Sequence, residues 1–290
     1  MNTMANYADF QTERPFDFAK RSTIGCGGKS KIGLYPKTRE ETVDLLRRLE
    51  QQATPYFVVG NLSNVLPMDG ETEKPVVCTK RLTAIDFDGK LYAEAGVSSG
   101  AFLQFCREKG LTGGEFLLGI PCTLGGALFM NAGADGRYIA EIVDKVWVYR
   151  KGEVCALSKT ECRYAYKDSV FMREGGVILG ANFLLKKGTA EEIELRRAYY
   201  AARRAHLPTG RSMGCVFKNP EGRSAGALIE GAGLKGLRLG GARISEVHAN
   251  FILNDGGATA GDIRRLIEII KNAVFAQYGI RLEEEIRYFT

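Results

Sequence analysis

Residues 119–138 read GIPCTLGGALFMNAGADGRY, and this glycine-rich stretch decides the fold. A second such segment, Gly60-Asn61-Leu62-Ser63-Asn64, follows the apolar run PYFVV directly. Glycine lets backbone N–H groups approach a phosphate with no Cβ in the way, and Ser, Thr and Asn side chains add neutral donors. Each segment alone is more simply interpreted as a tight turn. Together, in one α/β chain, the two segments predict a phosphate cradle.

The pattern around these segments alternates between helix and strand. Thr38 is expected to cap a helix over TREETVDLLRRLEQQ, and a second helix is expected near Ser98. The segments DKVWVYR and KGEVCALS predict a hairpin, and GGVILGANFLLKKG predicts a further strand. This order indicates an α/β (α+β) fold.

The last hundred residues form a separate predicted domain. A long helix is expected to begin at Thr189 and to stop before Pro208, which we interpret as a domain boundary. Thr259 and Asp262 have the spacing of a capping box for another helix, and RLEEEIRYF is expected to close the chain as a strand.

Composition limits the possible functions. A net charge of +6 suits anionic ligands such as nucleotides, but no dense basic stripe with interleaved aromatic residues suggests nucleic-acid binding. The seven cysteines include no CxxC pair, so neither a disulfide framework nor a metal site is expected. We expect no leader sequence at the N-terminus and no membrane insertion, which favours a cytoplasmic location.

Six segments, in order, resemble the landmarks of the UDP-N-acetylenolpyruvoylglucosamine reductase family. The resemblance extends from about Thr23 to Ile286 and indicates the shorter subtype, which lacks an extra loop in the substrate domain. The six segments are VVGNLSNVL, GIPCTLGGALFMNAGADG, YAYKDSVF, GCVFKNP, LIEGAGLKGLRLGGARISEVHANFILN and LEEEI.

The resemblance implies a three-part fold. Residues 1–78 and 79–188 would form two subdomains of an FAD-binding fold of the vanillyl-alcohol-oxidase-like type, and residues 189–290 an α/β domain for the UDP-sugar. The implied reaction consists of two half-reactions in one site. NADPH gives a hydride to FAD, and the reduced flavin passes it to the enolpyruvyl ether, which yields UDP-N-acetylmuramate for peptidoglycan.

The resemblance also assigns residues to the cofactor and the substrate. Tyr166, Ser169, Lys218 and Asn219 would bind the substrate, with Lys218 and Asn219 meeting its diphosphate. Leu62 and Cys122 stand where the family usually has glycine. The residues assigned to the cofactor are Gly60, Asn61, Leu62, Ser63, Asn64, Pro121, Cys122, Thr123, Gly125, Gly126, Asn131, Ala132, Gly133 and Ile178.

Three residues are assigned to catalysis. Cys215 replaces the usual serine as the proton donor, which is chemically sensible because a thiol is the stronger acid. Glu285 matches the catalytic glutamate, although Glu283 and Glu284 are rival interpretations. Lys167 replaces an arginine and would stabilise the charge that develops on the substrate carboxylate. A packed cysteine, a solvated acidic run and a surface lysine are the corresponding structural interpretations.

Two other functions remain open at this point. One is a flavin oxidoreductase that acts on a different substrate. The other is a diverged paralogue that binds flavin or a nucleotide sugar with altered or lost turnover, because Leu62, Cys122 and Lys167 depart from the family pattern. We expect a monomer or a weak oligomer.

Overall fold

The computed structural model describes residues 7–289, and the described chain divides into two compact units. The first unit comprises the chain up to Arg14, Ile32–Asn61 and Lys74–Ala205, and the second comprises Pro15–Lys31, Leu62–Glu73 and the chain from His206 on. Residues 1–6, where we expected no leader sequence, and Thr290 lie outside the described residues. The domain boundaries at residues 78 and 188 stay predictions.

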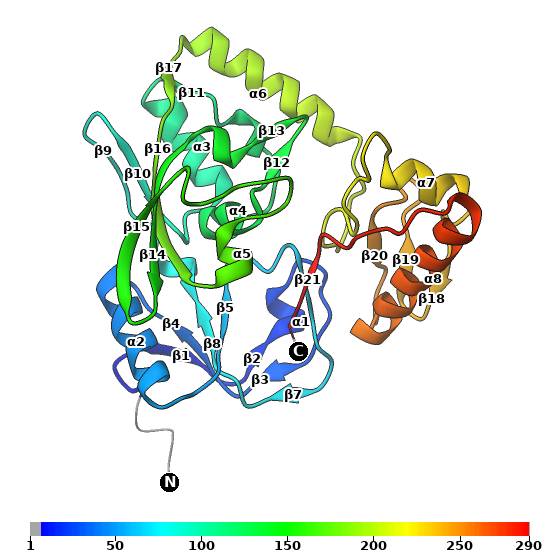
Figure 1. The fold of residues 1–290 in the computed structure, drawn as a ribbon, viewed down its shortest axis with the longest axis horizontal. Coiled ribbons are helices and arrows are strands. Elements are labelled where there is room, and N and C mark those ends of the chain that lie inside the picture. Colours follow the sequence, from blue (N-terminus) through cyan, green and yellow to red (C-terminus); the bar gives the residue numbers. More distant parts are fainter. Residues whose placement is uncertain (1–6, 290) are drawn as a thin grey trace. The chain divides into compact units, whose positions relative to one another are not determined.

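The first unit begins with a four-stranded sheet (Figure 1). Its order is β1 (Gln11–Glu13), β4 (Gly33–Tyr35), β8 (Val76–Cys78) and β5 (Phe57–Val59), and the last three strands are parallel. Helix α2 (Arg39–Gln51) joins β4 to β5, and its N-cap is Thr38, as predicted. The Thr38 hydroxyl accepts from the Glu41 N–H at 3.1 Å, which satisfies one of the free amides of the first turn.

A five-stranded antiparallel sheet follows in the same unit. Strands β14 and β15 form the predicted hairpin, and the helix predicted near Ser98 is α3, whose N-cap is Ser98. The order is β15 (Glu153–Ser158), β14 (Val143–Arg150), β16 (Val177–Phe183), β10 (Leu91–Glu94) and β9 (Ile85–Phe87). The other elements of this unit are η2 (Thr79–Arg81), α3 (Ser99–Glu108), β11 (Leu111–Thr112), η3 (Glu115–Leu117), α4 (Leu124–Met130), β12 (Gly133–Ala134), β13 (Arg137–Tyr138), η4 (Ile139–Glu141), α5 (Val170–Glu174), β17 (Lys186–Lys187) and α6 (Ala190–Ala205).

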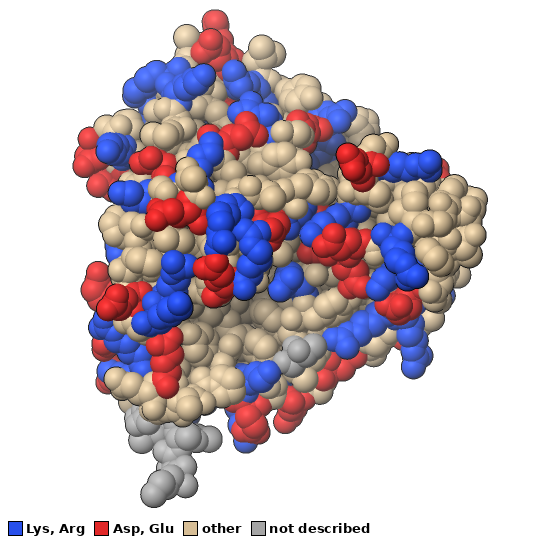
Figure 2. Space-filling model, in the orientation of Figure 1, with Lys and Arg blue, Asp and Glu red and all other residues tan. Residues whose placement is uncertain are grey.

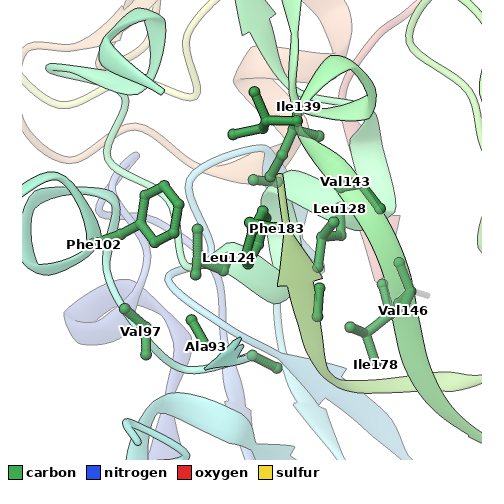
Figure 3. Packing of buried hydrophobic residues seen from close by; sticks show 14 of the residues in the cluster. Ala93, Val97, Phe102, Leu124, Leu128, Ile139, Val143, Val146, Ile178 and Phe183 are labelled. Carbon is green, nitrogen blue, oxygen red and sulfur yellow. The ribbon is translucent and has the colours of Figure 1, made fainter. Parts of the chain in front are cut away.

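Helix α4 is anchored by the core of this sheet. In Figure 3, Leu124 and Leu128 of α4 lie near Phe183 of β16, and all three side chains are at most 2% exposed. Burying each large apolar side chain contributes about 1.5–3 kcal/mol. The buried side chains of Leu124 and Leu128 therefore anchor the glycine-rich stretch that contains α4 to the core of the sheet.

The second unit is built around α8 (Ala260–Tyr278). The predicted capping box of Thr259 and Asp262 is confirmed, and Gly279 ends the helix in the left-handed region with φ 69°. The apolar face of the helix, including Ile263 and Ile270, is fully buried. The other elements are β2 (Phe16–Asp17), α1 (Phe18–Arg21), β3 (Lys29–Ser30), β6 (Val65–Pro67), β7 (Glu71–Thr72), α7 (Ala225–Gly231), β18 (Arg238–Leu239), β19 (Ala242–Ile244), β20 (Ile252–Asn254) and β21 (Arg287–Phe289).

Charged side chains of both signs are interspersed over the face drawn in Figure 2. None of the helices within residues 7–289 is long and apolar enough to cross a membrane.

Candidate active site

The two glycine-rich turns meet within the first unit. Strand β5 ends at Val59, just before Gly60, and the Asn61 side chain donates from Nδ2 to the carbonyl oxygen of Pro121 at 2.9 Å. A Cβ on Gly60 would overlap the Oγ1 of Thr123, so no other residue fits there without a shift. The structure therefore brings together two segments that are far apart in the sequence.

The start of α4 packs against the segment that directly follows β10. The N–H groups of Leu124 and Gly125 donate to the carbonyls of Val97 and Ala95, both at 2.8 Å. A Cβ on Gly125 would lie 2.9 Å from the Cβ of Ala95, so this glycine allows a close approach. Gly126 differs, because a Cβ there would meet only Thr123 Oγ1, at 3.5 Å. The open side of the helix start is therefore at Gly126.

The loop after β5 offers unused amides. Within residues 7–289, the main-chain N–H groups of Asn61, Leu62, Ser63 and Asn64 donate to no protein acceptor. Leu62 has φ 51°, in the left-handed region that favours glycine, and its side chain is only 4% exposed. A run of amides without protein acceptors suits a diphosphate, which is the group of FAD that such a loop would hold.

Sequence reasoning missed Lys80. Its ammonium donates to Asn61 Oδ1 at 2.9 Å, which places a cation at the loop. Lys80 lies in the short helix η2, whose Thr79 hydroxyl donates to the Val59 carbonyl. No turn motif marks this position, and only the parallel pairing of β5 with β8 brings it to the loop.

Cys122, which stands at a usual glycine position, is buried. Burial raises the pKa of its thiol to about 11, so the thiol is neutral at physiological pH. The side chain therefore packs as a small apolar group rather than as a nucleophile.

Asn131, Ala132 and Gly133 shape the chain after α4. Asn131 caps the helix with φ 45°, accepts from the Ala140 N–H, and donates from Nδ2 to the Ala165 carbonyl at 2.7 Å. The Ala132 N–H donates to the carbonyl of Ala127 within α4. A Cβ on Gly133 would overlap the carbonyl oxygen of Arg137 across the hairpin of β12 and β13. The hydrogen bonds of Asn131 and Ala132 described here are all with main-chain groups.

Tyr166 and Lys167 form the tip of a tight turn. The main chains of Ala165 and Asp168 exchange hydrogen bonds of 3.1 and 3.2 Å, and Lys167 has φ 52°. The Ser169 hydroxyl is fully buried and donates to the Phe129 carbonyl, at the end of α4, at 2.7 Å. Asn131 and Ser169 thus fix this turn to α4.

Ile178, assigned to the cofactor, lies in β16 with its side chain in the core of the sheet. Its neighbour Val177 lines a cavity of about 520 Å³, together with Tyr56, Val58 and Tyr149. Burial and a hydrogen bond to Glu50 raise the pKa of Tyr149, whose hydroxyl donates to that carboxylate at 2.7 Å.

The second unit brings the remaining predicted residues together. The Glu285 N–H donates to the Val216 carbonyl, and the Lys218 N–H donates to the Glu283 carbonyl, both at 2.8 Å. Residues 215–218 therefore run antiparallel to residues 283–286, and Cys215 adjoins Phe251 on the other side. The segments that carry the predicted thiol and the predicted carboxylate are neighbours.

The three glutamates of LEEEI differ in their partners. The Glu283 carboxylate lies 2.5 Å from the Lys218 ammonium, and that of Glu284 accepts from Lys271 at 3.0 Å and from the Tyr288 hydroxyl. Glu284 is thus held in a structural network away from Lys218. Asn219 uses its Oδ1 to accept from the Ala225 N–H, at the start of α7.

His248 is a packed residue. A Cβ on Gly226 would lie 2.9 Å from its ring, its Nδ1 accepts from the Asn250 N–H, and burial lowers its pKa.

Among residues 7–289, no group of three or more His, Cys, Asp or Glu side chains is arranged to hold a metal ion.

Comparisons with known proteins place these observations in context. Residues 206–289 match the family model "UDP-N-acetylenolpyruvoylglucosamine reductase, C-terminal domain", and residues 31–157 match an FAD binding domain. The FAD-binding α/β fold expected from the sequence is thereby confirmed.

Two relatives are the UDP-N-acetylenolpyruvoylglucosamine reductases of Geotalea uraniireducens and Geobacter metallireducens. They are 38% and 39% identical to this chain, and each match covers 93% of this chain and 91% of the relative. The crystal structure of the reductase from Thermus caldophilus is 33% identical, with a TM-score of 0.85 over 97% of this chain and 100% of that one.

Proposed function

The chain belongs to the UDP-N-acetylenolpyruvoylglucosamine reductase family, and on this premise we propose that it reduces the enolpyruvyl ether of UDP-N-acetylglucosamine to UDP-N-acetylmuramate. Its cofactor is FAD and its hydride donor NADPH, and the product serves peptidoglycan synthesis. The proposal rests chiefly on the junction of the two glycine-rich turns through Asn61, in a chain that matches the reductases over 93% of its length.

The loop after β5 and the start of α4 would hold the cofactor. The unused amides of residues 61–64 and the open side of Gly126 fit the FAD diphosphate, with Lys80 as a nearby cation. When bound, FAD would supply the hydride transfer between NADPH and the alkene of the substrate.

Three residues carry out the chemistry of the second half-reaction. Adding a hydride to the terminal alkene carbon leaves negative charge on the adjacent carbon and its carboxylate, which the Lys167 ammonium stabilises. The Cys215 thiol then gives its proton to that carbon and is reprotonated from water. Glu285 serves as the second acid–base group, a role supported by its place on the segment beside Cys215.

Four residues are proposed to bind the substrate. Lys218 and Asn219 bind the diphosphate, and Tyr166, which is 43% exposed, offers its hydroxyl to the substrate. Ser169 contributes through the turn that it fixes to α4, because its hydroxyl already donates to Phe129. We propose further that the chain acts in the cytoplasm, where NADPH and nucleotide sugars are made, as a monomer or a weak oligomer.

The two half-reactions, followed separately by stopped-flow absorbance, test the role of Cys215. In Cys215→Ala, NADPH should bleach the flavin at the normal rate, whereas reoxidation by the enolpyruvyl substrate should slow by about 100-fold or more, since only that step needs the proton. Cys215→Ser is the matched control and should retain appreciable activity. Equal slowing of both half-reactions in the alanine variant would contradict the proposal.

A further inference from the structure

The cation assigned to the substrate diphosphate is already neutralised by the protein. The Nζ of Lys218 lies 2.5 Å from Oε1 of Glu283. We propose that Glu283 is a competing counter-ion, which the diphosphate of the substrate must displace from Lys218, and that Glu283 thereby sets the affinity for nucleotide diphosphates. This inference rests on the proposed role of Lys218.

The backbone fixes the geometry of this pair. Phe217 and Glu284 form an antiparallel bridge, and the Lys218 N–H donates to the Glu283 carbonyl next to it. Residues at paired positions point to the same face, so the ammonium and the carboxylate are held on one side of the two segments. Glu283 can release Lys218 only by rotating its side chain.

The two partners differ in exposure, and this decides which one moves. The Lys218 side chain is 18% exposed and that of Glu283 is 73% exposed. Solvent competes strongly for a carboxylate as exposed as this one, so breaking the pair costs little. Lys218 remains in place, and an arriving anion takes over its ammonium.

The neighbouring ion pair shows the alternative arrangement. Lys271 binds both Glu268 and Glu284, and the hydrogen bond that it donates to Glu284 raises the pKa of Lys271. Glu284 is only 19% exposed and also accepts from Tyr288. Among the described residues, the side chains of Lys218 and Glu283 have no ionic partner other than each other. A ligand can therefore displace Glu283 from Lys218 more easily than Glu284 from Lys271.

A carboxylate that remains close to bound diphosphate repels it. Replacing Glu283 with glutamine keeps the size of the side chain and removes both the competition and the repulsion. The expected result is tighter binding of a ligand with a diphosphate and no change for a ligand without one.

The test is calorimetric titration of the FAD-loaded enzyme with UDP and, separately, with uridine. Glu283→Gln should lower the Kd for UDP by about fivefold, the size expected for losing one exposed ion pair. Glu283→Ala should change it in the same direction. Glu268→Gln, which removes an exposed carboxylate from a different lysine, is the matched control and should leave the Kd unchanged.

Lys218→Met separates this inference from the proposed function. It should weaken UDP binding, and adding Glu283→Gln to it should then give a smaller gain than in the wild-type enzyme, because only the repulsion remains to be removed. If Lys218→Met weakens UDP binding but Glu283→Gln leaves it unchanged or weaker, the inference is wrong and the role of Lys218 stands. If Lys218→Met has no effect, the role proposed for Lys218 fails as well. An equal gain of Glu283→Gln for uridine would also overturn the inference.

Discussion

The side chain of Asn131 donates from Nδ2 to the carbonyl oxygen of Ala165 at 2.7 Å. This bond ties the end of α4 to the turn that carries Tyr166 and Lys167. The start of the same helix carries Thr123 and Gly126, which we assign to the cofactor. One short helix therefore spaces the proposed flavin loop from the proposed substrate turn.

Removing this tie should affect the substrate and spare the cofactor. Asn131→Gly keeps the left-handed backbone but removes the bond from Nδ2 to the Ala165 carbonyl and the bond that Oδ1 accepts from the Ala140 N–H, so the free energy of unfolding should fall by about 1–3 kcal/mol. The KM for the enolpyruvyl substrate should rise while the Kd for FAD stays unchanged. Urea unfolding, steady-state kinetics and flavin titration measure the three quantities. A weaker FAD complex with an unaltered KM would instead make Asn131 a cofactor residue.

The close contact between the two glycine-rich turns predicts a strict requirement at Gly60. Gly60→Ala should push Thr123 away and weaken FAD binding by about tenfold or more, since a Cβ would overlap its hydroxyl. Gly100→Ala is the control, because a Cβ there has no neighbour nearer than 4.0 Å and alanine favours helix. Titration of the apoprotein with FAD gives the affinities. Equal affinities for both variants would refute the contact.

Lys80 should contribute to cofactor binding through charge. Lys80→Met should weaken FAD binding by about threefold to tenfold at low ionic strength, and the deficit should shrink as salt is added because the contact is exposed. Lys90, an exposed lysine of the same unit, provides the control variant Lys90→Met. A deficit that does not depend on salt would point to lost packing instead.

Four buried thiols predict a loss of stability at alkaline pH. Burial raises the pKa of Cys26 and Cys106 to about 12 and that of Cys122 and Cys162 to about 11, from an ordinary value of 9.0. Above pH 9 the unfolded chain releases these protons first, so the contribution is fully present below pH 9 and is lost as the pH rises toward the folded values. Each thiol should lower the free energy of unfolding by about 1.4 kcal/mol per pH unit in that window.

Urea unfolding between pH 8 and pH 11 measures this slope. Cys106→Ala should reduce the slope of the free energy of unfolding against pH by the contribution of one proton, about 1.4 kcal/mol per pH unit. This holds whatever the substitution does to stability at pH 8. An unchanged slope would mean that this thiol ionises equally in both states.

Local sequence patterns were sufficient to predict those features of the fold that depend only on neighbouring residues. Thr38, Ser98 and Thr259 cap the expected helices, since a cap needs only an oxygen and the next amides. The predicted strand over RLEEEIRYF is only partly confirmed. β21 begins at Arg287 and pairs with β6, whereas Glu284 bridges to Phe217. The alternation of apolar and polar residues within RLEEEIRYF predicts a strand. It does not reveal that the two halves of this segment pair with different parts of the chain.

The contacts of side chains in the site were less predictable. Asn131 and Ser169 match ligand positions by motif, yet both bond to main-chain carbonyls that are distant in sequence. Lys80 reaches Asn61 only because β5 and β8 are parallel neighbours. Such contacts depend on tertiary pairing, which a single sequence does not encode locally.

The second unit is assembled from chain segments that leave the ribosome far apart in time. The Thr23 hydroxyl donates to the Ser212 carbonyl, and the Asp69 carboxylate accepts from the N–H groups of Ala260 and Gly261. At roughly 5–20 residues per second, the nascent segment around Thr23 waits about ten seconds or longer for its partners to be synthesised. The first unit, which excludes Pro15–Lys31 and Leu62–Glu73, can fold meanwhile, so most of the residues proposed to bind flavin are expected to be ordered before the unit that holds the thiol is complete.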